Sequence, residues 1–376
     1  MDIVQKLDRF WRNVSAGLTA EQLWTQFRRE TRASVAVFSA ETGRDVSEEW
    51  SRHGGRRAVM RAVAKAMFYR LTPARRIIFL VACVLLVWPQ TEFSNERIHI
   101  FFPNAGFAAF LFLILLVLEL ADRVSLKRDL EIAREMQRML VPQSAPSVDG
   151  IDIAFATRPA NTVAGDYYDA FLRAGGKSLM LFVADVAGKG IPSGLLMARF
   201  EASVHLLCDE SAPLKDVMER LNRTIWERSG GGRHFITCFA AELDVESRAL
   251  TWVSAGHNPP LIVRASGKVE KLAQGGLPLG MFPAARYEAG HGELQHGDWL
   301  VIYTDGVTEA NDTTDAEFGD ARLEKLAQGF GKTPAAECMK RLFTAVDAFA
   351  GTAPQADDIT CLLLRVAAAQ KAGSTN

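Results

Sequence analysis

Two hydrophobic runs separated by a polar stretch stand out in the first third of the chain. They cover residues 77–88 and 100–121, and the connection between them reads PQTEFSNERIH. The second run matches the ~20 apolar residues that an α-helix needs to cross a bilayer, whereas the first is shorter. Together they predict a transmembrane helical hairpin over residues 77–121. The alternative is a pair of core helices in a soluble domain, but the basic segment before them offers little apolar surface to cover their phenylalanines.

Basic residues gather at the outer ends of this hairpin. Residues 1–76 carry 15 Lys and Arg against 8 Asp and Glu, a surplus of seven. The stretch 123–128 adds three more basic residues, whereas the connection contains only Arg97. Positive charge marks the cytoplasmic side of a membrane protein. Both ends of the hairpin are therefore expected in the cytoplasm.

The segments on either side of the hairpin are predicted to be helical. The basic N-terminal region, 1–76, ends in the amphipathic stretch RAVMRAVAKAMFYRL, which suits a helix on an anionic membrane surface or an ordinary solvated helix. In the linker 122–149, a repeat with spacings of four and three resembles the seam of a coiled coil and predicts a homodimer through this helix. The repeat consists of Leu126, Leu130, Ala133, Gln137 and Leu140. Pro142 is expected to end the helix.

Beyond residue 150 the pattern changes to short apolar strands mixed with helices. Strands are expected at 151–157, 178–186, 235–243, 250–254, 261–264, 299–303 and 359–365, and helices at 192–210, 213–228, 320–328 and 334–350. Strands joined by short turns and alternating with pairs of helices favour antiparallel sheets covered by helices. The last residues, 369–376, are expected to form a disordered tail.

Composition narrows the classes of function. The formal net charge is −1 over 376 residues, so the molecule has no large field to attract nucleic acid, and no such partner is expected. The five cysteines are scattered and lack the paired spacing of a zinc site. They are expected to be reduced core residues, and the chemistry must lie with other side chains.

Acidic residues stand where several apolar strands begin or end. They are Asp166 in VAGDYYD, Asp185 in LFVADVAGKG, Asp305 in LVIYTDGVTEA, and Asp357 and Asp358 in QADDITCLLLR. A carboxylate in such a place is costly to desolvate unless a cation meets it, so the set predicts a shared cation. Oxygen ligands without clustered His or Cys select Mg²⁺ or Mn²⁺. Two such ions would activate a water for attack on a phosphoryl group.

A series of motifs places these aspartates in a known context. LEIAREMQRMLVPQ, VAGDYYD, ADVAGKGIPSGLLMA, TCFAAELD, SAGHNPPLIV, GLPLGM, YTDGVTEA and DDIT follow one another in this order. With them, residues 130–366 resemble the PPM (protein phosphatase 2C-like) serine/threonine phosphatases of the SpoIIE/RsbU branch. The resemblance implies an α+β fold over residues 150–368: a four-layered αββα sandwich of two antiparallel sheets flanked by helices, here preceded by an α-helical membrane region.

The resemblance also implies a site for two Mn²⁺ or Mg²⁺ ions. The implied catalytic residues and ligands are Asp166, Asp185, Asp305 and Asp357. In this scheme Asp185 bridges the two ions and the carbonyl of Val186 is a further ligand. Asp358 stands where many relatives have Asn, and is expected to support the other ligands or to replace one of them.

Some positions depart from the family or carry weaker signals. Ala187 stands where eukaryotic members have a His that protonates the leaving group, and Arg158 does not match the position of their phosphate-binding Arg. The identity of a general acid therefore stays open. His257 is predicted to be a structural turn residue, and Arg233 to lie in a flexible connection or a flap over the substrate. Glu309 is expected either to support the metal site or to be a solvated acid.

The function that follows from the resemblance is hydrolysis of phosphoserine or phosphothreonine on a regulatory protein. By analogy with the branch, that partner is a phosphorylated STAS-domain protein, an anti-anti-sigma factor. The location implied is the bacterial inner membrane, with the catalytic domain in the cytoplasm and the hairpin 77–121 as the anchor. Two alternatives remain open: a non-catalytic membrane-tethered scaffold that binds phosphoproteins, and a hydrolase for a small phosphorylated metabolite.

Overall fold

The computed structural model of the protein describes residues 68–69, 71–88, 91–95, 98–102, 104–173, 175–208, 212–228 and 232–367. The chain divides into two compact units, Met1–Ser125 and Leu126–Asn376. Most of the predicted N-terminal region and the predicted tail 369–376 lie outside the described residues.

In the first unit, two apolar helices are joined by a β-hairpin. Helix α5 (Pro73–Val87) leads into strands β1 (Thr91–Asn95) and β2 (Ile98–Phe102), and helix α6 (Asn104–Leu140) follows. The second apolar run of the sequence begins at residue 100, whereas α6 begins at Asn104. Residues 100–102 belong to β2.

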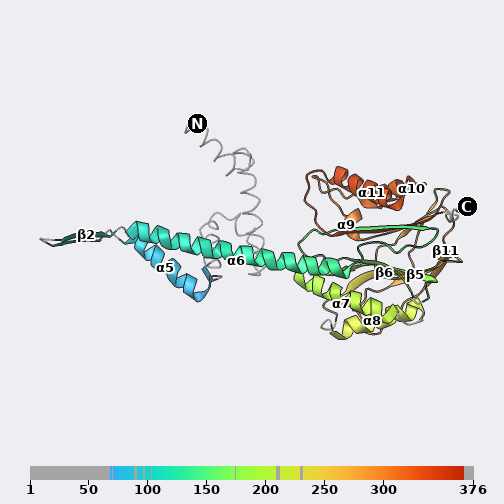
Figure 1. Ribbon diagram of the computed structural model, residues 1–376, viewed down its shortest axis with the longest axis horizontal. Helices are drawn as coiled ribbons and strands as arrows, with labels where there is room; N and C mark the ends of the chain where they lie inside the picture. The colour runs from blue at the N-terminus through green and yellow to red at the C-terminus, as the bar shows by residue number, and fades with distance from the viewer. Residues whose placement is uncertain are drawn as a thin grey trace, which may run out of the picture. The chain divides into compact units, whose positions relative to one another are not determined.

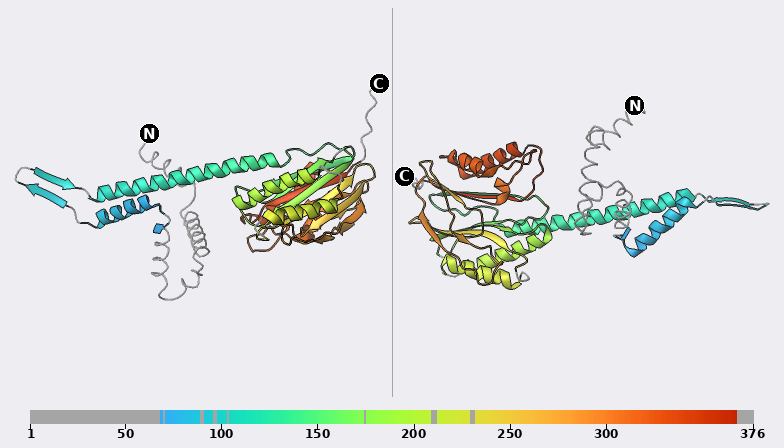
Figure 2. Two further views of the ribbon diagram at one scale, coloured as in Figure 1. Left: turned by 90° about the horizontal axis from the view of Figure 1, so that it is seen from below. Right: turned by 180° about the vertical axis from the view of Figure 1, so that it is seen from behind.

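Helices α5 and α6 pack side by side within this unit (Figures 1 and 2). Arg75 at the start of α5 donates a hydrogen bond of 2.7 Å to Asp122 of α6. One step further along, the rings of Phe79 and Phe112 lie 5.8 Å apart. The two helices therefore run in opposite directions, as a hairpin requires. Much of their remaining apolar surface is exposed, including Ile77, Val84, Phe110 and Leu116.

Of the described helices, α6 alone is long and apolar enough to cross a membrane by length and composition. Helix α5 has 15 residues, which rise about 22 Å, less than the ~30 Å hydrocarbon core of a bilayer. The predicted boundary between hairpin and linker at residues 121 and 122 falls inside α6, which is one continuous helix.

In the part of α6 that belongs to the second unit, most residues of the predicted coiled-coil repeat pack against the rest of that unit. Leu130, Ala133, Gln137 and Leu140 are half-buried, and Gln137 hydrogen-bonds to the loop before Asp166 in the same unit. Leu126, the first residue of the predicted repeat, is exposed, as are Ile132, Met136 and Met139 on another face. Most of the predicted seam is therefore occupied within the chain, because the same spacing also suits packing of a helix against its own domain.

The second unit contains two sheets. One has the order β10-β7-β6-β5-β4, with β11 also paired to β7, and the other has the order β3-β13-β12-β8-β9. The strands of the first sheet are β4 (Tyr167–Leu172), β5 (Ser178–Val186), β6 (Ile236–Asp244), β7 (Ala249–Ala255), β10 (Gly275–Gly276) and β11 (Gly290–Glu293). Those of the second are β3 (Ile151–Arg158), β8 (Leu261–Val263), β9 (Val269–Lys271), β12 (Trp299–Tyr303) and β13 (Ile359–Val366). All pairings are antiparallel except that of β10 with β7.

Helices cover the outer face of each sheet and give four layers (Figures 1 and 2). Helices α7 (Ile191–Cys208) and α8 (Leu214–Arg228) pack on the first sheet. Helices α10 (Gly319–Gln328) and α11 (Ala335–Ala350) pack on the second. The predicted αββα sandwich is confirmed.

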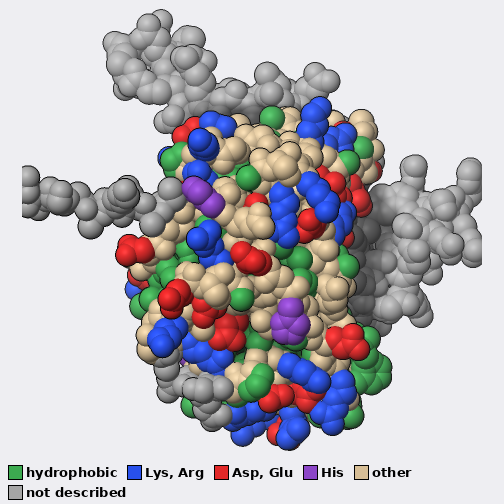
Figure 3. Space-filling view, turned by 90° about the vertical axis from the view of Figure 1, so that its right-hand side faces the viewer, with side chains coloured by type: hydrophobic (Ala, Val, Ile, Leu, Met, Phe, Trp, Pro, Cys, Tyr) green, Lys and Arg blue, Asp and Glu red, His purple; other side chains and the backbone are tan. Residues whose placement is uncertain are grey.

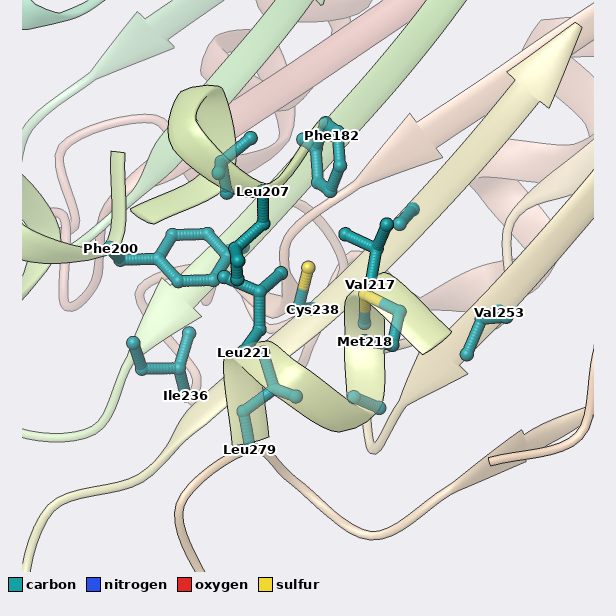
Figure 4. Packing of buried hydrophobic residues seen from close by; sticks show 14 of the residues in the cluster. Phe182, Phe200, Leu207, Val217, Met218, Leu221, Ile236, Cys238, Val253 and Leu279 are labelled. Atoms are coloured by element: carbon teal, nitrogen blue, oxygen red, sulfur yellow. The ribbon is translucent and has the colours of Figure 1, made fainter. Parts of the chain in front are cut away.

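Strand β5 shows why the sandwich has apolar cores on both sides of a sheet. Successive side chains of a strand point to opposite faces. Phe182 and its alternate neighbours pack against α7 and α8, whereas Leu181 and Val183 pack between the two sheets. Figure 4 shows the first of these cores, where Phe200 of α7 and Leu221 of α8 meet the sheet. Burial on both faces explains the continuous apolar run in the sequence of this strand.

On the face of the molecule shown in Figure 3, Lys and Arg side chains are interspersed with Asp and Glu side chains. The hydrophobic side chains on that face form small separate groups. The local surface thus has the mixed charge that the net value of −1 suggests.

Candidate metal centre

Asp166 lies at the end of an irregular loop that leads from β3 to β4. The loop residues Val163 and Ala164 are buried, and Asp166 itself is only 4% exposed. The hydroxyl of Thr304, at the end of β12, donates a hydrogen bond of 3.0 Å to Asp166 Oδ2. Since β12 belongs to the other sheet, this bond links the two sheets at the candidate site.

Asp185 and Val186 are the last two residues of β5. The loop before Asp166 passes close to them: a Cβ placed on Gly165 would lie 3.2 Å from the Val186 carbonyl oxygen and 3.5 Å from Asp185 Oδ1. Residue 165 therefore needs to be small, and Asp166, Asp185 and the Val186 carbonyl lie near one another.

Asp305 lies two residues after the end of β12 and begins the single-turn helix α9 (Asp305–Thr308). The next residue, Gly306, packs against the backbone of Asp357 and Asp358, and a Cβ there would overlap the carbonyl oxygen of Asp358. This close approach explains the glycine after the aspartate. It also brings the start of β13, with its two aspartates, beside Asp305.

Asp357 and Asp358 have different surroundings. Both oxygens of Asp358 accept hydrogen bonds from the loop before Asp166, from the backbone N–H of Ala160 at 2.7 Å and of Gly165 at 2.6 Å. Asp357 lies 3.0 Å from the ammonium of Lys189. These contacts favour the supporting role for Asp358, because its carboxylate already holds the loop in place.

The carboxylates raise one another's pKa. Burial, followed by the charge of Asp185, raises the pKa of Asp166 well above its usual range. Burial and the charges of Asp305, Asp357 and Asp358 raise the pKa of Asp185 to about 7. Burial and the charge of Asp357 raise the pKa of Asp305. The contacts of Gly165, Thr304 and Gly306 described above bring these side chains near one another, so the five aspartates form one cluster.

The donor chemistry of this cluster fits hard divalent cations. It offers carboxylate oxygens and the Val186 carbonyl, with two glycines that let the backbone approach closely. A divalent cation would relieve the repulsion that raises these pKa values. Within the part of the chain that the structure describes, however, no three Asp, Glu, His or Cys side chains already stand in a metal-binding arrangement. The side chains would therefore adjust when ions bind.

A cavity of about 410 Å³ adjoins the cluster on the side of Asp357 and Gly306. Its wall includes Arg158 and Asp347, whose side chains form an ion pair at 2.5 Å, and Glu309. The space is large enough for several side chains of a peptide.

The structure places the weaker sequence candidates in different surroundings. Arg158 is held by Asp347 and Gln355, and Arg233 is exposed. Burial and the charge of Asp305 raise the pKa of Glu309, which lines the cavity. Thus Glu309 lies near the site, whereas Arg158 is committed to a structural ion pair.

His257 is buried, and its Nδ1 lies 3.1 Å from the hydroxyl of Thr237, the residue paired with Asp185 across the sheet. Burial lowers the pKa of His257 to about 4, so the ring is neutral at pH 7. Its Nε2 has no hydrogen-bond partner. The structural role of His257 thus stays a prediction, and the ring lies next to the candidate metal centre.

Sequence reasoning did not assign Thr304, Lys189 or Gln137 to the site, and placed Gln137 only in the predicted coiled-coil repeat. Thr304 and Lys189 contact aspartates of the cluster directly, and Gln137 binds the loop that carries Asp166. Lys189 lies in the AGKG segment four residues after Asp185. A positive charge so close to a predicted acidic site could have identified it from the sequence. Thr304 and Gln137 are ordinary residue types, and only the fold brings them to the site.

Two antiparallel sheets between helical layers, with aspartates at strand ends of both sheets, define the fold of the PP2C-type phosphatases. The SiaA-PP2C domain of Pseudomonas aeruginosa has this fold: it superposes with a TM-score of 0.59 at 20% sequence identity, over 65% of this chain and 98% of that domain. The family model described as "Stage II sporulation protein E (SpoIIE)" matches residues 175–367, about half of the chain. The chain belongs to the SpoIIE family.

Two sequence relatives agree with this assignment. Phosphoserine phosphatase RsbU of Bacillus subtilis is 30% identical over 222 residues, which cover 59% of this chain and 65% of RsbU. Protein IcfG of Synechocystis is 28% identical over 277 residues, or 66% of this chain and 43% of IcfG. The chain thus spans less than two thirds of each of these relatives.

Proposed function

We propose that this chain is a metal-dependent protein serine/threonine phosphatase. The observation that carries the proposal is the convergence of Asp166, Asp185, Asp305 and Asp357 from both sheets into one cluster. Membership of the SpoIIE family and similarity to a phosphoserine phosphatase support the same reaction class.

Two Mn²⁺ or Mg²⁺ ions would be held by the cluster and by the carbonyl of Val186. When bound, such ions activate water and neutralise the charge that develops on a transferred phosphoryl group. Other residues of the chain position the ligands. Thr304 orients Asp166, and Asp358 holds the loop before Asp166 by accepting hydrogen bonds from two backbone N–H groups. These bonds hold Asp166 and its loop near the other aspartates before ions and substrate arrive, which reduces the adjustment that binding requires.

We further propose that the substrate is a phosphorylated STAS-type regulatory protein. The cavity beside Asp357 has room for residues that flank a phosphorylated one, and the similarity to phosphoserine phosphatase RsbU favours a protein substrate over a small metabolite. A cavity-filling change such as Ala353→Trp should then raise KM for the phosphoprotein and leave hydrolysis of p-nitrophenyl phosphate unchanged. Equal effects on both substrates would favour the small-molecule alternative.

The membrane anchor and the homodimer belong to the same proposal. The exposed apolar surface of α5 and α6 suits lipid, and Arg75 with Asp122 suits the cytoplasmic boundary. The catalytic domain would then lie in the cytoplasm at the inner membrane. If α6 pairs with a second copy, the exposed residues Ile132 and Met136 are available for the contact, since most of the predicted seam is occupied within the chain.

The reaction is tested by Mn²⁺-dependent phosphate release from p-nitrophenyl phosphate and from a phosphorylated STAS protein. Asp185→Ala and Asp305→Ala should each abolish turnover of both substrates. Asp244→Asn is the matched control, because Asp244 lies at the opposite end of β6 from the residues paired with Asp185 and Val186. A wild-type protein that binds phosphoprotein but releases no phosphate at saturating Mn²⁺ would support the scaffold alternative instead.

A further inference from the structure

Gln137 joins helix α6 to the loop that carries Asp166. Its Nε2 donates a hydrogen bond of 2.7 Å to the carbonyl oxygen of Ala164, and its Oε1 accepts one of 2.9 Å from the N–H of the same residue. Both ends of one side-chain amide are thus used on a single residue of the loop. Ala164 lies two positions before Asp166 and one before Gly165, which touches the Val186 carbonyl.

These two bonds replace the secondary structure that the loop lacks. Residues 159–166 belong to neither a helix nor a strand, and Ala164 is 5% exposed. A buried peptide group without a partner is costly, so Ala164 depends on Gln137 for its hydrogen bonds. On its other side the loop is held by Asp358, through the N–H groups of Ala160 and Gly165. The position of Asp166 is therefore set from two directions.

Helix α7 meets the same point. A Cβ placed on Gly194 would overlap Val163 of the loop, and it would lie 3.6 Å from Gln137 Nε2. The backbone of α7 thus approaches the loop as closely as a glycine permits. Because this region is closely packed, the loop cannot follow a displacement of α6 without moving against Gly194 or releasing its bonds to Gln137.

We propose that Gln137 is a positioning residue through which α6 sets the place of Asp166 and hence the affinity of the site for divalent cations. This inference rests on the proposed function, since it assumes that the aspartate cluster binds metal. With the two bonds formed, Gly165 and Asp166 stand beside Asp185 and the Val186 carbonyl. When a shift of α6 breaks them, the loop relaxes and the site loses affinity.

The test compares Mn²⁺ binding by the full-length wild type and by Gln137→Leu, followed by the electron paramagnetic resonance signal of free Mn²⁺. Leucine keeps a similar volume but makes neither hydrogen bond. We expect the dissociation constant for Mn²⁺ to rise about 10-fold, the effect typical of residues that orient metal ligands. The rate of p-nitrophenyl phosphate hydrolysis at saturating Mn²⁺ should return to the wild-type range, because Gln137 touches no substrate.

Two further variants complete the experiment. Gln143→Leu is the matched control: Gln143 hydrogen-bonds only near its own helix end, to the carbonyls of Arg138 and Val141, and its loss should not change Mn²⁺ binding. Gln137→Asn keeps the amide but withdraws it by one methylene, and should weaken binding even if Gln137→Leu fails to fold. The inference would be overturned if the Gln137 variants fold and bind Mn²⁺ as tightly as the wild type. This holds even if they melt at a lower temperature. A wild type that binds no Mn²⁺ would instead refute the proposed function itself.

Discussion

Two adjacent aspartates at the start of β13 perform separate tasks. Asp357 faces the cation of Lys189 and the cavity, whereas both oxygens of Asp358 are bonded to backbone N–H groups of a loop that lies some 190 residues earlier in the chain. Charge and hydropathy do not distinguish the two, and only the resemblance to the family assigned them different roles. Their difference arises from the direction of each side chain at the strand end, and only the fold determines which partners lie on each side.

At the residue scale, His257 should make stability depend on pH. Its pKa is lowered to about 4 in the folded protein, against about 6.5 in an unfolded chain. The neutral ring therefore favours the folded state above pH 6.5, and this contribution is lost as the pH falls toward 4. Between pH 8 and pH 5 we expect a loss of about 2 kcal/mol in the free energy of unfolding from this group.

The measurement is chemical denaturation at both pH values for wild type and His257→Gln. The variant should show a weaker pH dependence by about the stated 2 kcal/mol. His291→Gln is the control, because His291 is exposed. Identical pH dependence of wild type and the His257 variant would show that the buried ring does not carry this effect.

At the scale of elements, one buried carboxylate fixes the start of β12 against the turn that follows β8. Asp298 accepts hydrogen bonds from the backbone N–H of Ala265 and Gln295 and forms an ion pair of 2.7 Å with Arg264. Its side chain is 2% exposed. Loss of the carboxylate leaves Arg264 partly unpaired and two N–H groups without an acceptor.

Asp298→Ala should therefore lower the free energy of unfolding by about 3 kcal/mol, as expected when one partner of a buried pair is removed. Catalysis at a permissive temperature should be retained, since Asp298 lies at the opposite end of β12 from Asp305. Glu337→Ala removes an exposed ion pair with Arg341 and should change stability by less than about 0.5 kcal/mol. Equal losses in the two variants, measured by urea denaturation, would contradict this account.

Periodicity in the sequence predicted the long strands and the four large helices of the catalytic domain, because their burial follows a regular pattern. It missed β11, whose sequence GHGE has no apolar side chain. That strand exists because Gly290 packs against the ring of Trp252 on β7, a contact that no local pattern reveals. Strand β4 was also missed, since the acidic and aromatic residues around Asp166 were interpreted as a metal-binding turn.

The acidic residues of the candidate site were predictable from the sequence, but the residues that hold them in place were not. Five aspartates at strand ends point to a cation by charge alone. Thr304, Gln137 and the hydrogen bonds of Asp358 depend on contacts between segments far apart in the sequence. Such contacts follow from the sheet topology, which the resemblance implied only in outline.

At the scale of the whole molecule, α6 is one continuous helix. We therefore predict that the rate depends on how far one part of this helix is rotated about its axis relative to the other part. Each residue added to a helix turns the rest of that helix by about 100°, so two added alanines rotate it by about 200° and seven by about −20°. Inserted after Ala121 in the full-length protein in lipid bilayers, two alanines should change the rate at limiting Mn²⁺ by about 2- to 30-fold. Seven alanines should leave it near the wild-type rate, and equal effects of both insertions would argue against transmission through the helix.

The short ribbon formed by β1 and β2 limits what this protein can sense. If α5 and α6 span the bilayer as proposed, two five-residue strands and their turn are all that emerges on the outer side between them. A signal from the outer side would then reach the protein through this ribbon or through the lipid around the two helices.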